Sequence, residues 1–146
     1  MKKIVFIVLV FVLGCFGDTI KVVNGKVKTF DTHKIPAKYI EKFSLYEPYE
    51  NKTYTFEGIS LKNLANLYGN NPSKIEMTAI DFFESKFDAN DILDGRWILV
   101  FKQNGKYMTP LQKGPARMVD KTFKKNQEKL TFFDKWVWMI EEIKFQ

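Results

Sequence analysis

The sequence predicts one compact α+β domain, a mixed and mostly β-sheet fold with a few short helices. Two Asn-Gly pairs, at 24–25 and 104–105, each separate two β-prone runs, which is the strongest short-range signal for a hairpin. Trp97–Lys102 is almost continuously apolar, as in a central strand that is buried on both faces. Tyr54–Gly69 combines a strand, a turn and a short amphipathic helix, and a helix of this length needs a sheet to pack against.

The first half of the domain is expected to open with a hairpin over Thr19–Phe30. Thr32–Tyr46 is expected to be a connector, with a helical turn at Ala37–Phe43 that is entered through Pro36. Within Tyr54–Gly69, Gly58 would allow a sharp turn and Ser60 would cap the helix. Gly69 would end that helix in the C′ position. The apolar stripe of the helix has the spacing expected of a buried face and consists of Leu61, Leu64, Ala65 and Tyr68.

The second half predicts more strands than helices. Lys74–Ile80 and Phe82–Phe87 have the composition of two successive strands, and Asp88 is placed to cap a helical turn over Ala89–Leu93. A short strand is expected at Ala116–Val119. Trp136–Phe145 would close the sheet as a strand with inward-facing Trp136, Trp138 and Ile140, then, after a bulge, Ile143 and Phe145.

Residues 1–17 have the form of an export signal that is removed from the mature protein. Lys2 and Lys3 precede the apolar run Ile4–Leu13, which is too short for a membrane span of about 20 residues. Val12–Cys15 resembles a lipobox, so lipidation of Cys15 is expected, and the alternative is ordinary cleavage after Gly17. Either route predicts a periplasmic or envelope-anchored protein, and a real lipobox would make it bacterial.

Charge and cysteine content exclude several classes of function. Without Lys2 and Lys3, the formal charge falls from +6 to about +4, with acidic and basic residues interspersed. An exported chain of modest charge is not expected to bind nucleic acid. Cys15 is the sole cysteine, so its lipidation or loss leaves no thiol for a disulfide, a metal site or a nucleophile.

Several segments, in order across residues 19–146, resemble the molybdopterin-binding domain of sulfite-oxidase-type oxidoreductases. They are Glu57–Leu64 (Gly-hydrophobic-x-Leu-x-x-Leu), Ala79–Phe83 (Ala-x-Asp-x-aromatic), the Asn-Gly pair at 104–105, Gly114–Val119 (Gly-Pro-x-Arg-hydrophobic-Val) and Lys135–Val137 (Lys-Trp-hydrophobic). The resemblance is closest to short, exported versions of the family. It implies a molybdopterin-domain type of fold and an oxidoreductase-like scaffold.

The departures from the family pattern all concern the cofactor. The family ligates molybdenum through a cysteine before the Gly-x-x-Leu element, whereas Ile40–Lys52 contains none. The family's His-Gly before Pro-x-Arg is Gln112-Lys113 here, and its glycine-rich loop is replaced by Thr122–Phe133, which has no glycine. We therefore expect no cofactor and no metal site, and molybdopterin is implied by the resemblance alone.

Five residues are candidates for ligand binding, and no catalytic residue is predicted; the five are Asp81, Gly114, Pro115, Arg117 and Lys135. Arg117 could present its planar guanidinium to a phosphate or carboxylate, or could form a structural pair with Asp81 or Asp120. Asp81 could orient a ligand or cap a turn.

The remaining chemistry-bearing residues have ordinary structural interpretations. His33 is the sole histidine and lacks an accompanying nucleophile or second metal ligand, so a solvated loop position is favoured. The tryptophans at 97, 136 and 138 could form a ligand platform, but strand alternation favours packing in the core. A basic surface at Lys121, Lys124, Lys125 and Lys129 could hold the domain near a membrane if Cys15 is lipidated.

The sequence leaves three functions open. The first is an exported ligand- or partner-binding module of the cell envelope with a sulfite-oxidase-like scaffold and no molybdenum chemistry, its partner being an unknown small ligand or an envelope protein. The second is a molybdopterin-dependent oxidoreductase or an accessory subunit of one, in which the cofactor supplies the redox chemistry. The third is a structural lipoprotein of the envelope.

Overall fold

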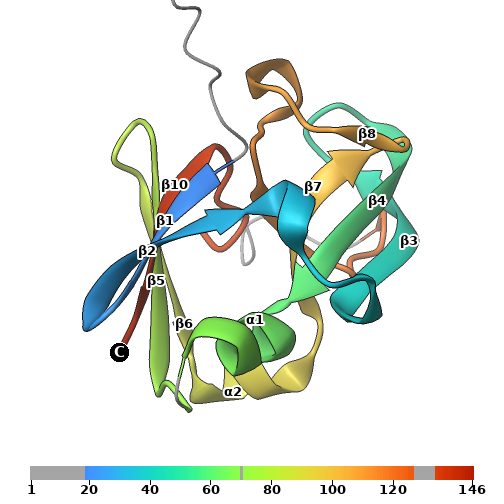
Figure 1. Cartoon of the computed structure of the whole chain (residues 1–146). Coiled ribbons are helices and arrows are strands. Elements are labelled where there is room, and N and C mark those ends of the chain that lie inside the picture. The colour runs from blue at the N-terminus through green and yellow to red at the C-terminus, as the bar shows by residue number, and fades with distance from the viewer. Residues whose placement is uncertain (1–18, 70, 127–133) are drawn as a thin grey trace, which may run out of the picture.

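The computed structural model describes residues 19–69, 71–126 and 134–146. Within these ranges the chain forms two β-sheets that lie side by side, with the two α-helices closing one end (Figure 1). The first sheet, sheet A, has the strand order β2 (Lys26–Asp31), β1 (Thr19–Asn24), β10 (Ile140–Phe145), β5 (Lys74–Ala79) and β6 (Glu84–Asp88). The second, sheet B, has the order β3 (Ile40–Glu47), β4 (Lys52–Ser60), β7 (Trp97–Gln103) and β8 (Lys106–Tyr107), with β9 (Arg117–Asp120) also paired to β7.

The helical elements are short and lie in the connections. The α-helices are α1 (Leu61–Tyr68) and α2 (Ala89–Asp94), and the 3₁₀ turns are η1 (Thr32–Lys34), η2 (Ala37–Tyr39) and η3 (Pro110–Gln112). The predicted α+β, mostly β-sheet class is confirmed. Among the described residues, no helix is both long enough and apolar enough to cross a membrane.

The structure confirms the strongest local signals of the sequence. The first Asn-Gly pair turns β1 into β2 with Ile20 opposite Phe30, and Gly25 has the positive φ of 66° that this turn requires. β7 is a central strand that pairs with β4, β8 and β9, and its residues 97–101 are buried. Asp88 caps α2 by accepting a hydrogen bond from the backbone N–H of Asp91.

Two glycines near α1, Gly58 and Gly69, do not have the backbone roles that the sequence predicted. Ser60 caps the helix as expected, accepting from the Asn63 N–H at 3.1 Å. Gly58 does not form a sharp turn but lies inside β4, at an irregularity in its register with β7. Gly69 is extended, with φ of −116°, so it is not a left-handed C′ residue. Glycine fits there because a Cβ would lie 2.8 Å from the ring of Phe145.

The strand predicted at Phe82–Phe87 begins only at Glu84, because Phe82 lies in the preceding turn with a φ of 69°. Two other predicted boundaries are also wrong. The expected connector Thr32–Tyr46 contains strand β3, which pairs along its whole length with β4, and the helical turn is limited to η2. Four of the eight residues of β3 are half-buried, so the strand lacks the clear alternation of buried and exposed side chains that marks a strand. The closing strand begins at Ile140 instead of Trp136, since the positive φ of Met139 (51°) interrupts the extended chain. The predicted bulge is present as a register shift between Ile140 and Glu142.

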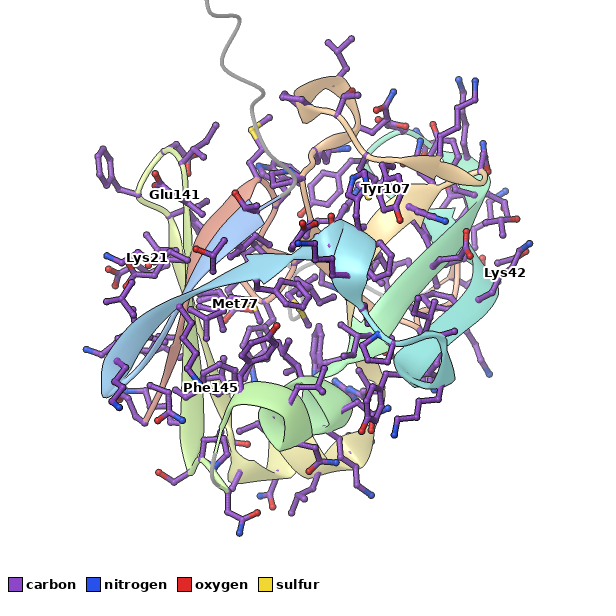
Figure 2. All side chains as sticks on the ribbon, viewed as in Figure 1. Lys21, Lys42, Met77, Tyr107, Glu141 and Phe145 are labelled. Carbon is purple, nitrogen blue, oxygen red and sulfur yellow. The ribbon has the colours of Figure 1, made fainter. Side chains whose placement is uncertain are left out.

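The core lies between the two sheets and is continuous from one to the other. Sheet A contributes Met77 and Phe145, which Figure 2 shows pointing toward sheet B, and α1 covers one end of the space with Leu61 and Leu64. The opposite end, where β1 and β10 begin and β5 ends, is not covered by an α-helix (Figure 1). This end carries the pockets described below.

Candidate functional site

Arg117 is buried in β9, with 1% of its surface exposed, and it is committed to an ion pair. Its Nη2 donates to Oε1 of Glu47 at 3.2 Å, and Glu47 is itself buried at the end of β3. The sequence proposed Asp81 or Asp120 as structural partners, and Glu47 was missed. Asp120 instead lies 3.5 Å from the Nε of Arg96. Burial lowers the pKa of the Arg117 guanidinium, and the Glu47 carboxylate partly opposes that shift.

Lys113 extends this pair into a group that we call the charged cluster, comprising Glu47, Glu50, Lys113 and Arg117. The Lys113 Nζ lies 3.3 Å from Glu50 Oε1 and 3.9 Å from Glu47 Oε2. Two cations therefore face two carboxylates, and the formal charges cancel. The Tyr54 hydroxyl donates a hydrogen bond to the Glu50 carboxylate. This hydrogen bond and the nearby Lys113 cation lower the pKa of Glu50.

Aromatic rings cover the charged cluster. The Lys113 Nζ is 5.1 Å from the ring centre of Trp138 and 5.5 Å from that of Tyr49, within the range of cation–π contacts. Those two rings meet edge to face at 4.7 Å. Burial raises the pKa of Tyr49 to about 12, so its hydroxyl is neutral throughout the physiological range.

A small pocket adjoins these rings and is the place where Asp81 lies. Its walls are Tyr49, Asp81, Phe83, Val137 and the rings of Trp136 and Trp138, and its volume is about 210 Å³. That volume is below the roughly 300 Å³ at which ligand pockets begin. Asp81 also accepts a hydrogen bond from the Phe83 N–H at 3.2 Å, which is the local turn role proposed as its alternative.

A larger pocket, which we call the end pocket, lies between the uncovered end of sheet A and the connection from β8 to β9. Its volume is about 590 Å³, within the usual range for ligand sites. Figure 2 marks its two sides by Glu141 and Tyr107. The lining residues are mostly apolar and comprise Thr19, Ile80, Tyr107, Met108, Thr109, Pro110, Gly114, Pro115, Ile140 and Glu141.

Gly114 and Pro115 both lie on the wall of the end pocket and are joined by a cis peptide bond. A Cβ on Gly114 would come 2.8 Å from the Cβ of Met108, and the Gly114 N–H donates to the Thr109 carbonyl at 2.8 Å. Close packing against its own chain thus explains this glycine without a bound phosphate.

Lys135 is separate from Arg117 and belongs to the neighbourhood of α2. Its Nζ lies 2.5 Å from Oδ2 of Asp91 and within 6 Å of the Phe87 and Trp97 ring centres. Burial disfavours the ionised Asp91 carboxylate, but hydrogen bonds from Lys135 and the Asp88 backbone outweigh it and lower its pKa. The contacts of Lys135 are therefore structural.

The other sequence candidates occupy varied positions. His33 stacks on Tyr107, with ring centres 3.6 Å apart. Trp97 and Trp136 are buried in the core, whereas Trp138 is half-buried over the charged cluster. In the basic surface, Lys121 pairs with Glu41 and Lys125 lies over the ring of Tyr46. Lys129 and Cys15 lie outside the described residues.

The described residues do not fit a molybdenum pterin of the family type. The resemblance places the family's thiolate before the Gly-x-x-Leu element, and the residues there in this chain, β3 and the following turn, contain no cysteine. A phosphate could not reach the buried Arg117, and the cluster offers no net positive charge to it. Within the described part of the chain, no three His, Cys, Asp or Glu side chains are grouped to hold a metal ion.

Comparison with known proteins supports a likeness of fold. No protein-family model and no curated protein matches the sequence. Among solved structures, the chain resembles the sulfane dehydrogenase SoxCD from Paracoccus pantotrophus, with a TM-score of 0.59 and 13% sequence identity. The match covers 87% of this chain and 37% of the other, so the chain spans little more than a third of that protein. The architecture is thus sulfite-oxidase-like, as the sequence motifs implied.

Proposed function

We propose that this protein is an exported binding module of the cell envelope that uses a sulfite-oxidase-like scaffold without molybdenum chemistry. The observation that carries the proposal is the contrast between the neutralised charged cluster and the open end pocket. Arg117, the cation expected to face a phosphate or carboxylate, is buried against Glu47. The end pocket, at about 590 Å³, is large enough for a ligand and is mostly apolar.

The walls of the end pocket define the ligand by its chemistry. Among the described lining residues, the single charged side chain is the carboxylate of Glu141, and none is cationic. An anionic group would be repelled there and would find no partner for its charge. We therefore expect a predominantly apolar ligand or partner segment that is neutral or carries a cationic group near Glu141.

Neutral and anionic fluorescent probes of similar size test this site. N-phenyl-1-naphthylamine should bind and gain fluorescence, whereas 8-anilinonaphthalene-1-sulfonate should bind at least tenfold more weakly. Ile80→Arg should reduce naphthylamine affinity about tenfold, because it places a charge in the apolar wall. Val27→Arg is the matched control, since Val27 is similarly exposed but lies at the other end of sheet A.

Two outcomes would overturn this binding site. Equal affinity for both probes would show that the pocket does not select by charge. Equal loss in the Ile80→Arg and Val27→Arg variants would place the naphthylamine elsewhere. Circular dichroism of both variants ensures that the comparison is made between folded proteins.

A second candidate is a molybdopterin-dependent oxidoreductase or its accessory subunit. It is favoured by the shared fold with a sulfane dehydrogenase and opposed by the misfit of the donor groups. The molybdenum content of the exported protein separates it from the first candidate.

A further inference from the structure

We propose that the end of the molecule bearing Phe82 and Leu111, which we call the apolar tips, docks on the surface of a lipid bilayer. Phe82 is 83% exposed and Leu111 is 90% exposed. Phe82 lies in the turn from β5 to β6 and Leu111 in η3, and both segments project at the uncovered end of sheet A (Figure 1). Ile80, two residues before Phe82, and Pro110, which precedes Leu111, both line the end pocket.

Phe82 has an unfavourable backbone conformation that its own packing does not compensate. Its φ is 69°, in the left-handed region, which costs an aromatic residue on the order of 1 kcal/mol. The turn is held by hydrogen bonds from the Phe82 N–H to the Ala79 carbonyl (3.0 Å) and from the Ala79 N–H to the Phe83 carbonyl (2.9 Å). The turn therefore presents an aromatic side chain to solvent at a cost to stability, which indicates a role outside the fold.

Leu111 is displayed by a similarly braced segment. The Thr109 N–H donates to Oε1 of Gln112 at 2.9 Å, and the Gln112 N–H donates to the Thr109 carbonyl at 2.9 Å. These bonds close η3 around its central residue, Leu111, and leave its side chain in solvent. Two separate, locally braced apolar residues suit insertion between lipid headgroups better than the flat core of a protein interface.

The position of Thr19 favours a lipid occupant over a protein. Thr19 begins β1 and lines the end pocket, so the chain enters the described domain beside the apolar tips. Cys15, the predicted lipidation site, stands four residues earlier, a reach of about 14 Å at full extension. A lipid on Cys15 would hold this end against the bilayer, where a second, apolar contact strengthens the attachment.

The charges around the tips define the kind of bilayer. Asp81, Glu84 and Glu141 are exposed near this end, and they would be repelled by anionic headgroups. Docking through the tips should therefore proceed on zwitterionic lipid. Docking through the basic surface at Lys121 and Lys125 would instead require anionic lipid.

A single-thiol fluorescence experiment tests the proposal. The exported chain carrying Cys15→Ser has no other cysteine, so Phe82→Cys, Leu111→Cys or Val27→Cys each provides one site for a nitrobenzoxadiazole label. With phosphatidylcholine vesicles, emission at positions 82 and 111 should rise and shift to the blue. The label at Val27, which is 66% exposed at the far end of sheet A, should not respond.

A partition measurement on unlabelled protein gives the size of the effect. Phe82→Ser and Leu111→Ser should each lower the partition coefficient about tenfold, as the loss of one buried apolar side chain predicts. Lys121→Glu together with Lys125→Glu should leave it unchanged. Three results would overturn the proposal. They are no vesicle binding, an equal response at Val27, and a requirement for anionic lipid together with sensitivity to the lysine changes. The first of these would assign the tips to a protein partner.

Discussion

The charged cluster and the end pocket lie near the same end of the domain but differ in chemistry: the cluster consists of paired, covered charges, and the pocket has an open, mostly apolar wall. In the cluster, Arg117 and Lys113 are balanced by Glu47 and Glu50 and covered by rings. In the end pocket, apolar side chains surround a space of about 590 Å³ that is open to solvent. The residues that resemble an anion site thus stabilise the fold, and the accessible surface is apolar.

This difference shows why a motif that resembles a family's does not transfer a function by itself. The arginine of Gly-Pro-x-Arg is present, yet its partner is set by β3, a different part of the chain. An arginine can serve a ligand if its donors face solvent with excess positive charge. Arg117 meets neither condition.

The largest predicted effect comes from opening the charged cluster. Glu47→Ala should reduce the free energy of unfolding by about 3–5 kcal/mol, because it leaves Arg117 buried without its carboxylate. Urea denaturation measures this change. Glu41→Ala is the matched control, since the Glu41–Lys121 pair is exposed and should contribute less than about 1 kcal/mol.

The double change Glu47→Leu with Arg117→Met sharpens the same test. Replacing a buried pair by apolar residues of similar volume is often neutral for stability, so most of the lost free energy should return. Naphthylamine binding at the end pocket should also survive. Loss of binding in a stable double variant would show that Arg117 serves the ligand after all.

A smaller effect, dependent on pH, is expected at the Lys135–Asp91 pair. The pKa of Asp91 is lowered in the folded state from its ordinary 3.8, so its ionised form stabilises the fold above that pH and loses this effect as pH falls through the folded pKa. Asp91→Asn should cost about 1–2 kcal/mol at pH 7 and progressively less below pH 3.8. Denaturation at several pH values measures this, and an unchanged cost in acid would contradict it. Asp94→Asn, at a more exposed carboxyl, is the control.

The smallest predicted effect is a gain of stability at an apolar tip. Phe82→Gly should leave the free energy of unfolding unchanged or raise it by at most about 1 kcal/mol, because glycine tolerates a φ of 69°. The same change should weaken vesicle binding. A clear loss of stability would mean that the Phe82 ring supports the fold.

Local signals in the sequence predicted most of the architecture. Asn-Gly turns, the Ser60 and Asp88 caps and the apolar strand at 97–101 are all determined by residues close in the chain. Strand β3 was missed because its half-buried residues show no clear alternation. The extent of the last strand was misjudged because a positive φ at Met139 has no reliable marker in its residue type.

The candidate site was less predictable, since it depends on contacts between distant segments. Glu47 and Arg117 are 70 residues apart, and nothing local marks Glu47 as buried. The end pocket combines β1, the β5–β6 turn and the segment after β8, so its apolar character appears only once the strands are ordered. The sequence did identify Gly114 and Pro115 as ligand-binding candidates, and both lie in the wall of this pocket.

The measurement that most directly tests the central claim is elemental analysis, with mass spectrometry, of the intact protein recovered from the cells that produce it. The account predicts molybdenum far below one atom per chain and no pterin in the extracted small molecules. The same spectrum would show a diacylglyceryl mass if Cys15 is lipidated. Stoichiometric molybdenum with a pterin would contradict the account and would make this a molybdenum enzyme with a ligand set unlike that of the family it resembles.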